Sequence, residues 1–216
     1  MYSAPTRTVQ EAIDYIERIF GDESGVQIEP ADLVMFINNA VDEINTTNRV
    51  LKESVTFPSV AGTNVYTFPE RNILQVEAIL YDGRLVRNVS YAHALENFIG
   101  VAPTTGYTDT SVPLYWWEWA GKFTFWPTPG EGTIQLDYTV RHQPVSLDDL
   151  DALLPLPDKY YTDVLTATLR QAYDLDEQPE LAGAQREALL ASLSRKAEEE
   201  RQAQKMYYEV ITLIDD

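Results

Sequence analysis

The strongest restriction on the fold comes from residues 113–141, where the side chains alternate with the two-residue period of β-strands. This segment, PLYWWEWAGKFTFWPTPGEGTIQLDYTVR, contains all four tryptophans of the chain. Ala120-Gly121 can close a first hairpin, because glycine accepts the positive φ that a tight turn needs. Residues 127–132 can close a second. The three predicted strands carry on one face, in order, Tyr115, Trp117 and Trp119; Phe123 and Phe125; and Ile134, Leu136, Tyr138 and Val140.

The β pattern extends back to about residue 52. Asp82-Gly83 is a hairpin signal between two further strands, and residues 91–99 predict a short helix. Along the strand before that turn, one face carries Leu74, Val76, Ala78 and Leu80, and the other carries Gln75, Glu77, Ile79 and Tyr81. Together with residues 113–141, this predicts a β region of about six strands.

Two segments before the β region have apolar residues at helical spacing. In the first, which ends at Phe20, Thr8 and Glu11 are placed as in a capping box and Gly21 is placed as a C-terminal stop. The second begins at Pro30, and proline is favoured at the first helical position. Both segments therefore predict amphipathic helices.

Helical spacing returns after the β region. Asp158 is placed to cap a helix that ends near Tyr173, and Pro179 opens a long, charge-rich helix that runs to about Tyr208. The predicted fold is α+β, a bundle of N- and C-terminal helices interrupted by an antiparallel β-sheet or sandwich domain. Its predicted parts are residues 1–50, the inserted β domain 51–145, the C-terminal helices 146–209 and a tail, 210–216.

Composition and charge limit the function. The chain of 216 residues has enough apolar material for a core, and the absence of cysteine excludes disulfides and thiolate metal sites. Thirty-four Asp and Glu against 16 Lys and Arg give a net charge of −18, which argues against tight nucleic-acid binding through a basic patch. Neither a signal peptide nor an apolar membrane span is expected, so we expect a soluble protein.

Motifs for catalysis are lacking. No P-loop, G-x-S-x-G or H-E-x-x-H motif occurs, and His93 and His142 are expected to be surface or turn residues. Among 34 carboxylates some pair always lies at glycosidase separation, so such a pair carries no information. We expect no enzyme, no metal and no cofactor.

The aromatic strand of residues 115–119 allows three interpretations. One face can pack a β core, or Tyr115, Trp117 and Trp119 can form a platform that stacks on sugar rings. Because Trp116 falls on the opposite face, large aromatics occupy both faces of one strand. A neighbouring subunit or a tail protein is therefore the preferred contact for Tyr115, Trp116, Trp117 and Trp119.

Four short motifs follow one another in a characteristic order. They are an A-G-T-x-x-Y turn from residue 61, a Y-D-G-R hairpin from Tyr81, an F-x-F-W-P-x-P segment from Phe123 and a P-x-x-Y helix opening at Pro157. With the flanking helices, this order resembles the adaptor proteins of the bacteriophage head-to-tail connector, including the tail tubular protein A type of podoviruses.

The resemblance implies a structural protein of the virion. Twelve copies would form a ring at the head-tail interface, assembled in the host cytoplasm. The ring would join the portal protein to a tail nozzle or another tail protein and would extend the DNA channel. DNA would pass without specific binding, and no membrane partner is implied. A carbohydrate-binding tail component that uses the exposed aromatics is the alternative.

The same resemblance suggests two further sets of residues. The apolar C-terminal tail would dock on the portal through Tyr207, Tyr208, Val210, Ile211, Leu213 and Ile214. Acidic side chains on the helices are candidates for the channel lining, because like charge repels DNA: Glu11, Asp14, Glu17, Glu198, Glu199 and Glu200.

Overall fold

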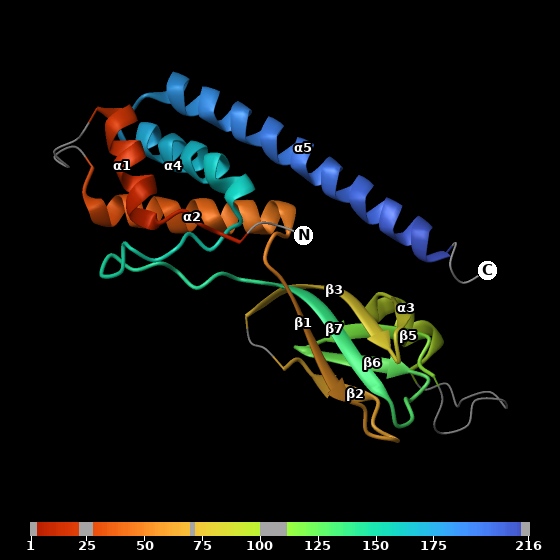
Figure 1. Cartoon of the computed structure of the whole chain (residues 1–216). Helices are drawn as coiled ribbons and strands as arrows, with labels where there is room; N and C mark the ends of the chain where they lie inside the picture. The colour runs from red at the N-terminus through yellow and green to blue at the C-terminus, as the bar shows by residue number, and fades with distance from the viewer. Residues whose placement is uncertain (1–3, 22–27, 70–71, 100–111, 213–216) are drawn as a thin grey trace. The chain divides into compact units, whose positions relative to one another are not determined.

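The computed structural model describes residues 4–21, 28–69, 72–99 and 112–212, with side chains as far as residue 202. The chain forms two compact units, one of residues 1–51 with 142–216 and the other of residues 52–141. The first unit is helical and the second is built on a sheet, which confirms the predicted α+β class (Figure 1).

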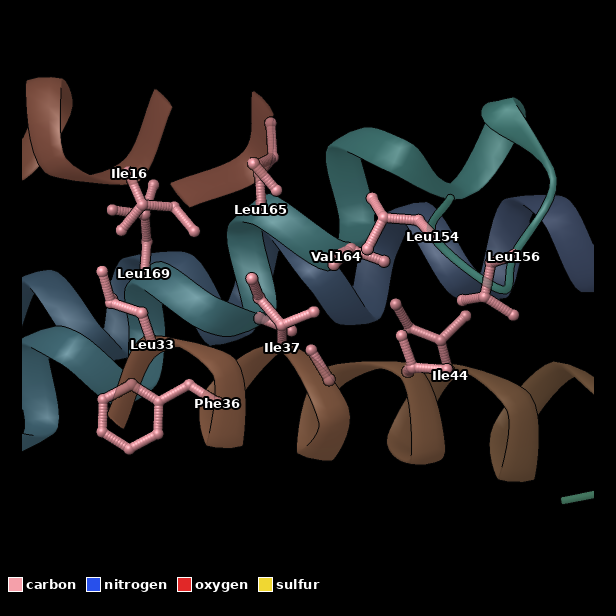
Figure 2. Close-up of a cluster of buried hydrophobic side chains, with 14 of the residues drawn as sticks. Ile16, Leu33, Phe36, Ile37, Ile44, Leu154, Leu156, Val164, Leu165 and Leu169 are labelled. Atoms are coloured by element: carbon pink, nitrogen blue, oxygen red, sulfur yellow. The ribbon is translucent and has the colours of Figure 1, made fainter. Parts of the chain in front are cut away.

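Among its described residues, the helical unit has four α-helices and a short 3₁₀ helix, η1. Their bounds are α1 Val9–Phe20, α2 Pro30–Asn48, η1 Asp158–Tyr160, α4 Tyr161–Leu175 and α5 Pro179–Thr212. Within this unit α5 runs back along α4 and continues well past the first turn of α4 (Figure 1). The apolar faces meet in one core, in which Ile16 of α1, Ile37 of α2 and Val164 of α4 are fully or almost fully buried (Figure 2).

The first helix begins and ends where its sequence predicts. The hydroxyl of Thr8 accepts a hydrogen bond from the Glu11 backbone N–H at 3.2 Å, which satisfies a donor that the first helical turn leaves unpaired. The carboxylate of Glu11 contacts the guanidinium of Arg7 at 3.6 Å. Gly21 ends the helix with φ of 82°, a conformation that glycine adopts at little cost.

Asp158 has a different role from the predicted one. It opens η1, and Tyr160 precedes α4 without a side-chain cap. The Asp158 carboxylate accepts two hydrogen bonds from Thr6, at 2.8 Å from the backbone N–H and 2.5 Å from the hydroxyl. These hydrogen bonds lower the pKa of Asp158. The prediction of a helix cap was wrong, because a distant segment of the chain uses the same carboxylate.

A charged pair joins α2 to α4. The Arg170 guanidinium donates two hydrogen bonds to the Glu43 carboxylate, at 2.9 and 2.8 Å. Hydrogen bonding to Glu43 raises the pKa of Arg170. Such two-pronged pairs fix orientation as well as adding energy, so this contact sets the register between the two helices.

The second unit is a seven-stranded curled sheet with the order β1-β7-β3-β4-β5-β6-β2. The bounds are β1 Lys52–Pro58, β2 Val65–Thr67, β3 Ile73–Tyr81, β4 Arg84–Asn88, β5 Tyr115–Trp119, β6 Lys122–Trp126 and β7 Thr133–Val140, with the helix α3 Tyr91–Asn97 between β4 and β5. β1 and β2 are at opposite ends of this order, yet the rings of Phe57 and Tyr66 are 6.3 Å apart. The sheet therefore curls until its two end strands share one core.

The sheet is mixed, although the sequence predicted antiparallel strands. β4 and β5 are parallel, pairing Arg87 with Tyr115 and Asn88 with Trp116. Parallel neighbours need a crossover between them, and α3 lies in this one. Every other pair of neighbouring strands is antiparallel.

The strand β3 does not keep the simple alternation that its sequence predicts. Its pairing with β7 shifts register between Ile73 and Gln75 and again between Val76 and Ala78. A bulge places one extra residue on one strand and thereby changes which side chains face the core. Val76 packs on the core, but after the second shift Ile79 and Tyr81 are buried there instead of Ala78 and Leu80.

Candidate interaction surfaces

One face of the aromatic strand β5 belongs to the core of the sheet. Trp116 is 5% exposed, and its register partner on β6 is Phe125, which is fully buried. Both residues belong to the cluster that also contains Ile134 and Leu136 of β7. Trp116 is therefore a packing residue of its own chain.

The opposite face of β5 is covered by Phe98, which directly follows α3. The Phe98 ring stacks on Trp126 at a centroid distance of 4.6 Å and on Tyr115 at 5.1 Å. It also lies 6.1 Å from the Trp117 ring, and Trp117 is 4% exposed. The crossover helix thus closes over an aromatic face that the sequence alone leaves unpartnered.

Trp119 is the most exposed of the predicted interface residues. It is 59% exposed, and its ring stacks on Tyr91 of α3 at a centroid distance of 4.1 Å. Tyr115 is half-buried. Because neighbouring rings of the same chain stack on Tyr115, Trp117 and Trp119, these residues do not form an open platform for sugar rings. Of the four predicted interface residues, Trp119 and part of Tyr115 are available to a partner.

The acidic residues predicted on α1 lie on its outer side. Glu11 and Asp14 are exposed, and Glu17 is half-buried. Asp14 accepts a hydrogen bond from the Gln10 side chain at 2.6 Å. Two of the three carboxylates are thus displayed to solvent on one helix.

The three acidic residues predicted near the end of α5 differ in their surroundings. Glu198 and Glu199 are exposed and contact Arg201 at 2.9 Å and Arg195 at 3.9 Å. Glu200 lies inside the bundle with 14% of its side chain exposed. One of its oxygens accepts hydrogen bonds from Lys159 Nζ at 2.7 Å and from the Tyr160 hydroxyl at 2.8 Å. Glu200 is therefore a contact between α5 and η1.

Sequence reasoning missed a nearly buried pair of charges beside Glu200. Lys196 of α5 donates to the Asp163 carboxylate of α4, and it also donates to the Lys159 carbonyl oxygen at 2.5 Å. A signal for it exists, because Lys196 and Glu200 continue the helical stripe of the buried residues Leu189 and Leu193. Charged residues at core-facing positions predict buried partners.

The predicted portal-docking tail is only partly described. Tyr207, Tyr208, Val210 and Ile211 lie in the last turns of α5, whose backbone is described to Thr212. Leu213 and Ile214 lie outside the described residues. The apolar sequence thus begins as a continuation of the long helix.

The two histidines differ in their exposure to solvent. His93 is exposed, as expected. The expectation of a surface or turn position was wrong for His142, whose side chain is 1% exposed and lies 3.0 Å from Asp42 and 3.3 Å from Asn38.

Within the described ranges, no three His, Asp or Glu side chains gather closely enough to hold a metal ion. Over the same residues, no helix combines the length and the apolar character needed to cross a membrane.

The family model of the SU10 adaptor proteins matches residues 7–210. The chain therefore belongs to the SU10 adaptor protein family, a family of phage structural adaptors, and it is a virion component that contacts other head or tail proteins. No curated protein matches the chain.

Proposed function

We propose that this protein forms a ring, twelve copies in number, that joins the portal to the tail and extends the DNA channel. The observation that carries the proposal is the family match, which covers both units and nearly all of α5. The two units suit a ring component, because each has its own core and can offer a separate contact surface.

The exposed acidic residues support a channel wall that DNA does not adhere to. Glu11 and Asp14 of α1 and Glu198 and Glu199 of α5 are exposed, and the chain has a net charge of −18. A wall of like charge repels the phosphate backbone and leaves DNA free to move. Glu200 is left out of this wall, because it bonds to Lys159 and Tyr160 inside the bundle.

The length of α5 supports a role for its C-terminal part in docking. The helix has 34 residues, which corresponds to about 51 Å at 1.5 Å per residue. Glu200 accepts a hydrogen bond from Tyr160 of η1, the segment just before α4. Beyond Glu200, the helix α5 continues through residues 201–212. We assign the C-terminal part of this extension, together with Leu213 and Ile214, to a groove on the portal.

The exposed aromatic ring of Trp119 is our candidate for a contact with a neighbouring copy or a tail protein. Exposed aromatic residues are enriched at protein interfaces because they bury a large area with little loss of conformational freedom. Tyr115 can add part of its ring to the same surface.

The test is to mix the purified protein with the portal protein of the same genome. Light scattering and electron microscopy then measure mass and symmetry. A closed ring of twelve copies stacked on the portal is the expected result. If a folded protein does not associate with the portal at any ionic strength, the adaptor ring is the wrong proposal.

A truncated chain that lacks residues 210–216 tests the docking tail. We expect loss of portal binding while the rest of the helical content, measured by circular dichroism, is retained. Trp119→Ala in the full chain is the matched comparison, and it should keep portal binding while weakening contacts between copies or with the tail. Unchanged portal binding by the truncated chain would remove the tail from the docking surface.

A further inference from the structure

The sheet has a gap where β4 stops. β4 pairs with β3 only at Ile79, Leu80 and Tyr81, and it pairs with β5 at Tyr115 and Trp116. The Val89 N–H still donates to the Trp116 carbonyl oxygen at 2.9 Å, and the chain then enters α3 through its cap, Ser90. Among the described residues, the pairing thus leaves residues 73–78 of β3 and residues 118–119 of β5 without a strand between them.

The register shows that these two unpaired edges face each other. Continuing both pairings beyond Val89 places residues 118–119 of β5 opposite residues 74–75 of β3, with no strand between them among the described residues. Adjacent strands are about 4.8 Å apart, so one absent strand leaves two edges separated by about twice that distance. The gap is therefore as wide as a single extended chain.

Two cavities occupy this gap. One, of about 550 Å³, is lined by residues 74–77 and 88–91 together with Trp116 and Glu118. The other, of about 330 Å³, shares residues 74–76 and Glu118 with it and ends at Phe68 and Gly121. The shared lining means that the two cavities form one slot along β3, which we call the β3–β5 slot.

The lining of the slot has one sign of charge. It contains apolar side chains, including Leu74, Val76 and Trp116, and two carboxylates, Glu77 and Glu118. Neither cavity is lined by lysine or arginine. Glu77 accepts a hydrogen bond from Thr139 at 2.9 Å, and Glu118 is exposed on the strand edge. A chain that enters the slot therefore meets apolar surface and negative charge.

We propose that the β3–β5 slot binds an extended segment of another virion protein, added as a strand between β3 and β5 and carrying a lysine or arginine beside Glu118. Backbone hydrogen bonds from the two open edges would hold such a segment, and its side chains would be selected by the slot. The inference rests on the proposed adaptor function, which supplies the partner proteins.

The charge favours a different protein over a second copy as the source of the segment. The chain has 34 acidic and only 16 basic residues, so most of its own segments would bring further negative charge toward Glu77 and Glu118. A basic segment from a portal or tail protein would bring the opposite charge.

Overlapping twelve-residue peptides from the portal and tail proteins of the same genome are the probes. Their binding to the full-length protein is measured by fluorescence anisotropy, and hydrogen exchange is followed with and without the peptide. We expect an extended peptide with a lysine or arginine to bind and to protect backbone amides in residues 73–78 and the amide of Glu118.

Two charge reversals make the test specific. Glu118→Lys should weaken that peptide about tenfold or more. Glu131→Lys is the matched control, because Glu131 is an exposed acid in the β6–β7 turn that lines neither cavity, and it should leave binding unchanged.

Three results would overturn the proposal. No peptide protects the two edges, or Glu118→Lys leaves binding intact, or the edge amides are already protected in the free protein because its own chain fills the slot. Portal association of the Glu118→Lys variant is measured in parallel. If this variant still forms the ring and no peptide binds in the slot, the proposed binding in the slot is wrong and the proposed adaptor function is retained.

Discussion

Lys196 of α5 donates to Asp163 of α4 where both side chains are almost removed from water, with 12% and 3% of their surfaces exposed. Removing charges from water is expensive, and the pair tolerates it because each charge has an opposite partner. Lys196 also bonds to the Lys159 carbonyl oxygen, so this one ammonium group holds α5 against both α4 and η1.

Lys196→Met should therefore destabilise the helical unit by about 3 kcal/mol, because it leaves the Asp163 carboxylate buried without its partner. The measurement is urea unfolding followed by far-ultraviolet circular dichroism. The double variant Asp163→Asn with Lys196→Met should lose less than the single variant. Arg195→Met is the control and should change stability by less than about 0.5 kcal/mol, because its contact with Glu199 is exposed to solvent.

Trp117 and Trp119 should respond differently to truncation. Trp117→Ala removes a buried ring under Phe98 and should destabilise the β unit by about 3–5 kcal/mol. Trp119→Ala loses mainly the stacking on Tyr91, about 1 kcal/mol. All four tryptophans lie in the β unit, so the fluorescence of the remaining three follows its unfolding. Equal losses would contradict the burial described for these two rings.

Gly132→Ala should destabilise the β unit by about 1–3 kcal/mol through overpacking. A β-carbon at Gly132 would lie 2.5 Å from the Tyr81 hydroxyl oxygen and 2.8 Å from Asp82 Oδ2, and Tyr81 is buried. Tryptophan fluorescence during urea unfolding measures the change. Combining it with Tyr81→Phe, which removes the nearest atom, should recover part of the loss.

Gly183→Ala is the matched control for that substitution. Gly183 lies in α5 and a β-carbon there has no neighbour within 4 Å among the described atoms. Replacing glycine by alanine in a helix raises helix propensity, so the helical unit should gain up to about 1 kcal/mol. A loss at Gly183 would show that its surroundings differ from those described.

The contact between Thr6 and Asp158 should break in acid. The Thr6 hydrogen bonds lower the pKa of Asp158 from its ordinary value of 3.8. A lowered folded-state pKa means that the contact contributes stability above the unfolded value and loses it as the pH falls through the folded value. The amide resonance of Thr6 should therefore titrate with a midpoint below 3.8.

Thr6→Val tests the cause of that shift. The Thr6 hydroxyl provides the largest contribution to the lowered pKa of Asp158, so its removal should move the midpoint upward. The carboxylate resonance of Asp158 measures this directly. An unchanged midpoint would mean that the hydroxyl does not bond to Asp158 in solution.

The sequence by itself determined those elements whose signals are local. Thr8 and Gly21 bound α1, and Pro30 opens α2, because caps and stops act within one helical turn. Asp82-Gly83 and Ala120-Gly121 close tight hairpin turns, as predicted, and both residues of each turn have positive φ. The order of the motifs sufficed to indicate the adaptor family.

Tertiary structure decided where side chains point and what covers them. Two register shifts in β3 bury Ile79 and Tyr81, and a bulge is set by the partner strand, so alternation cannot reveal it. Asp158 bonds to Thr6 and Lys196 to Asp163 across long sequence separations. Such choices depend on which segments the fold brings together, and local patterns in the chain do not contain them.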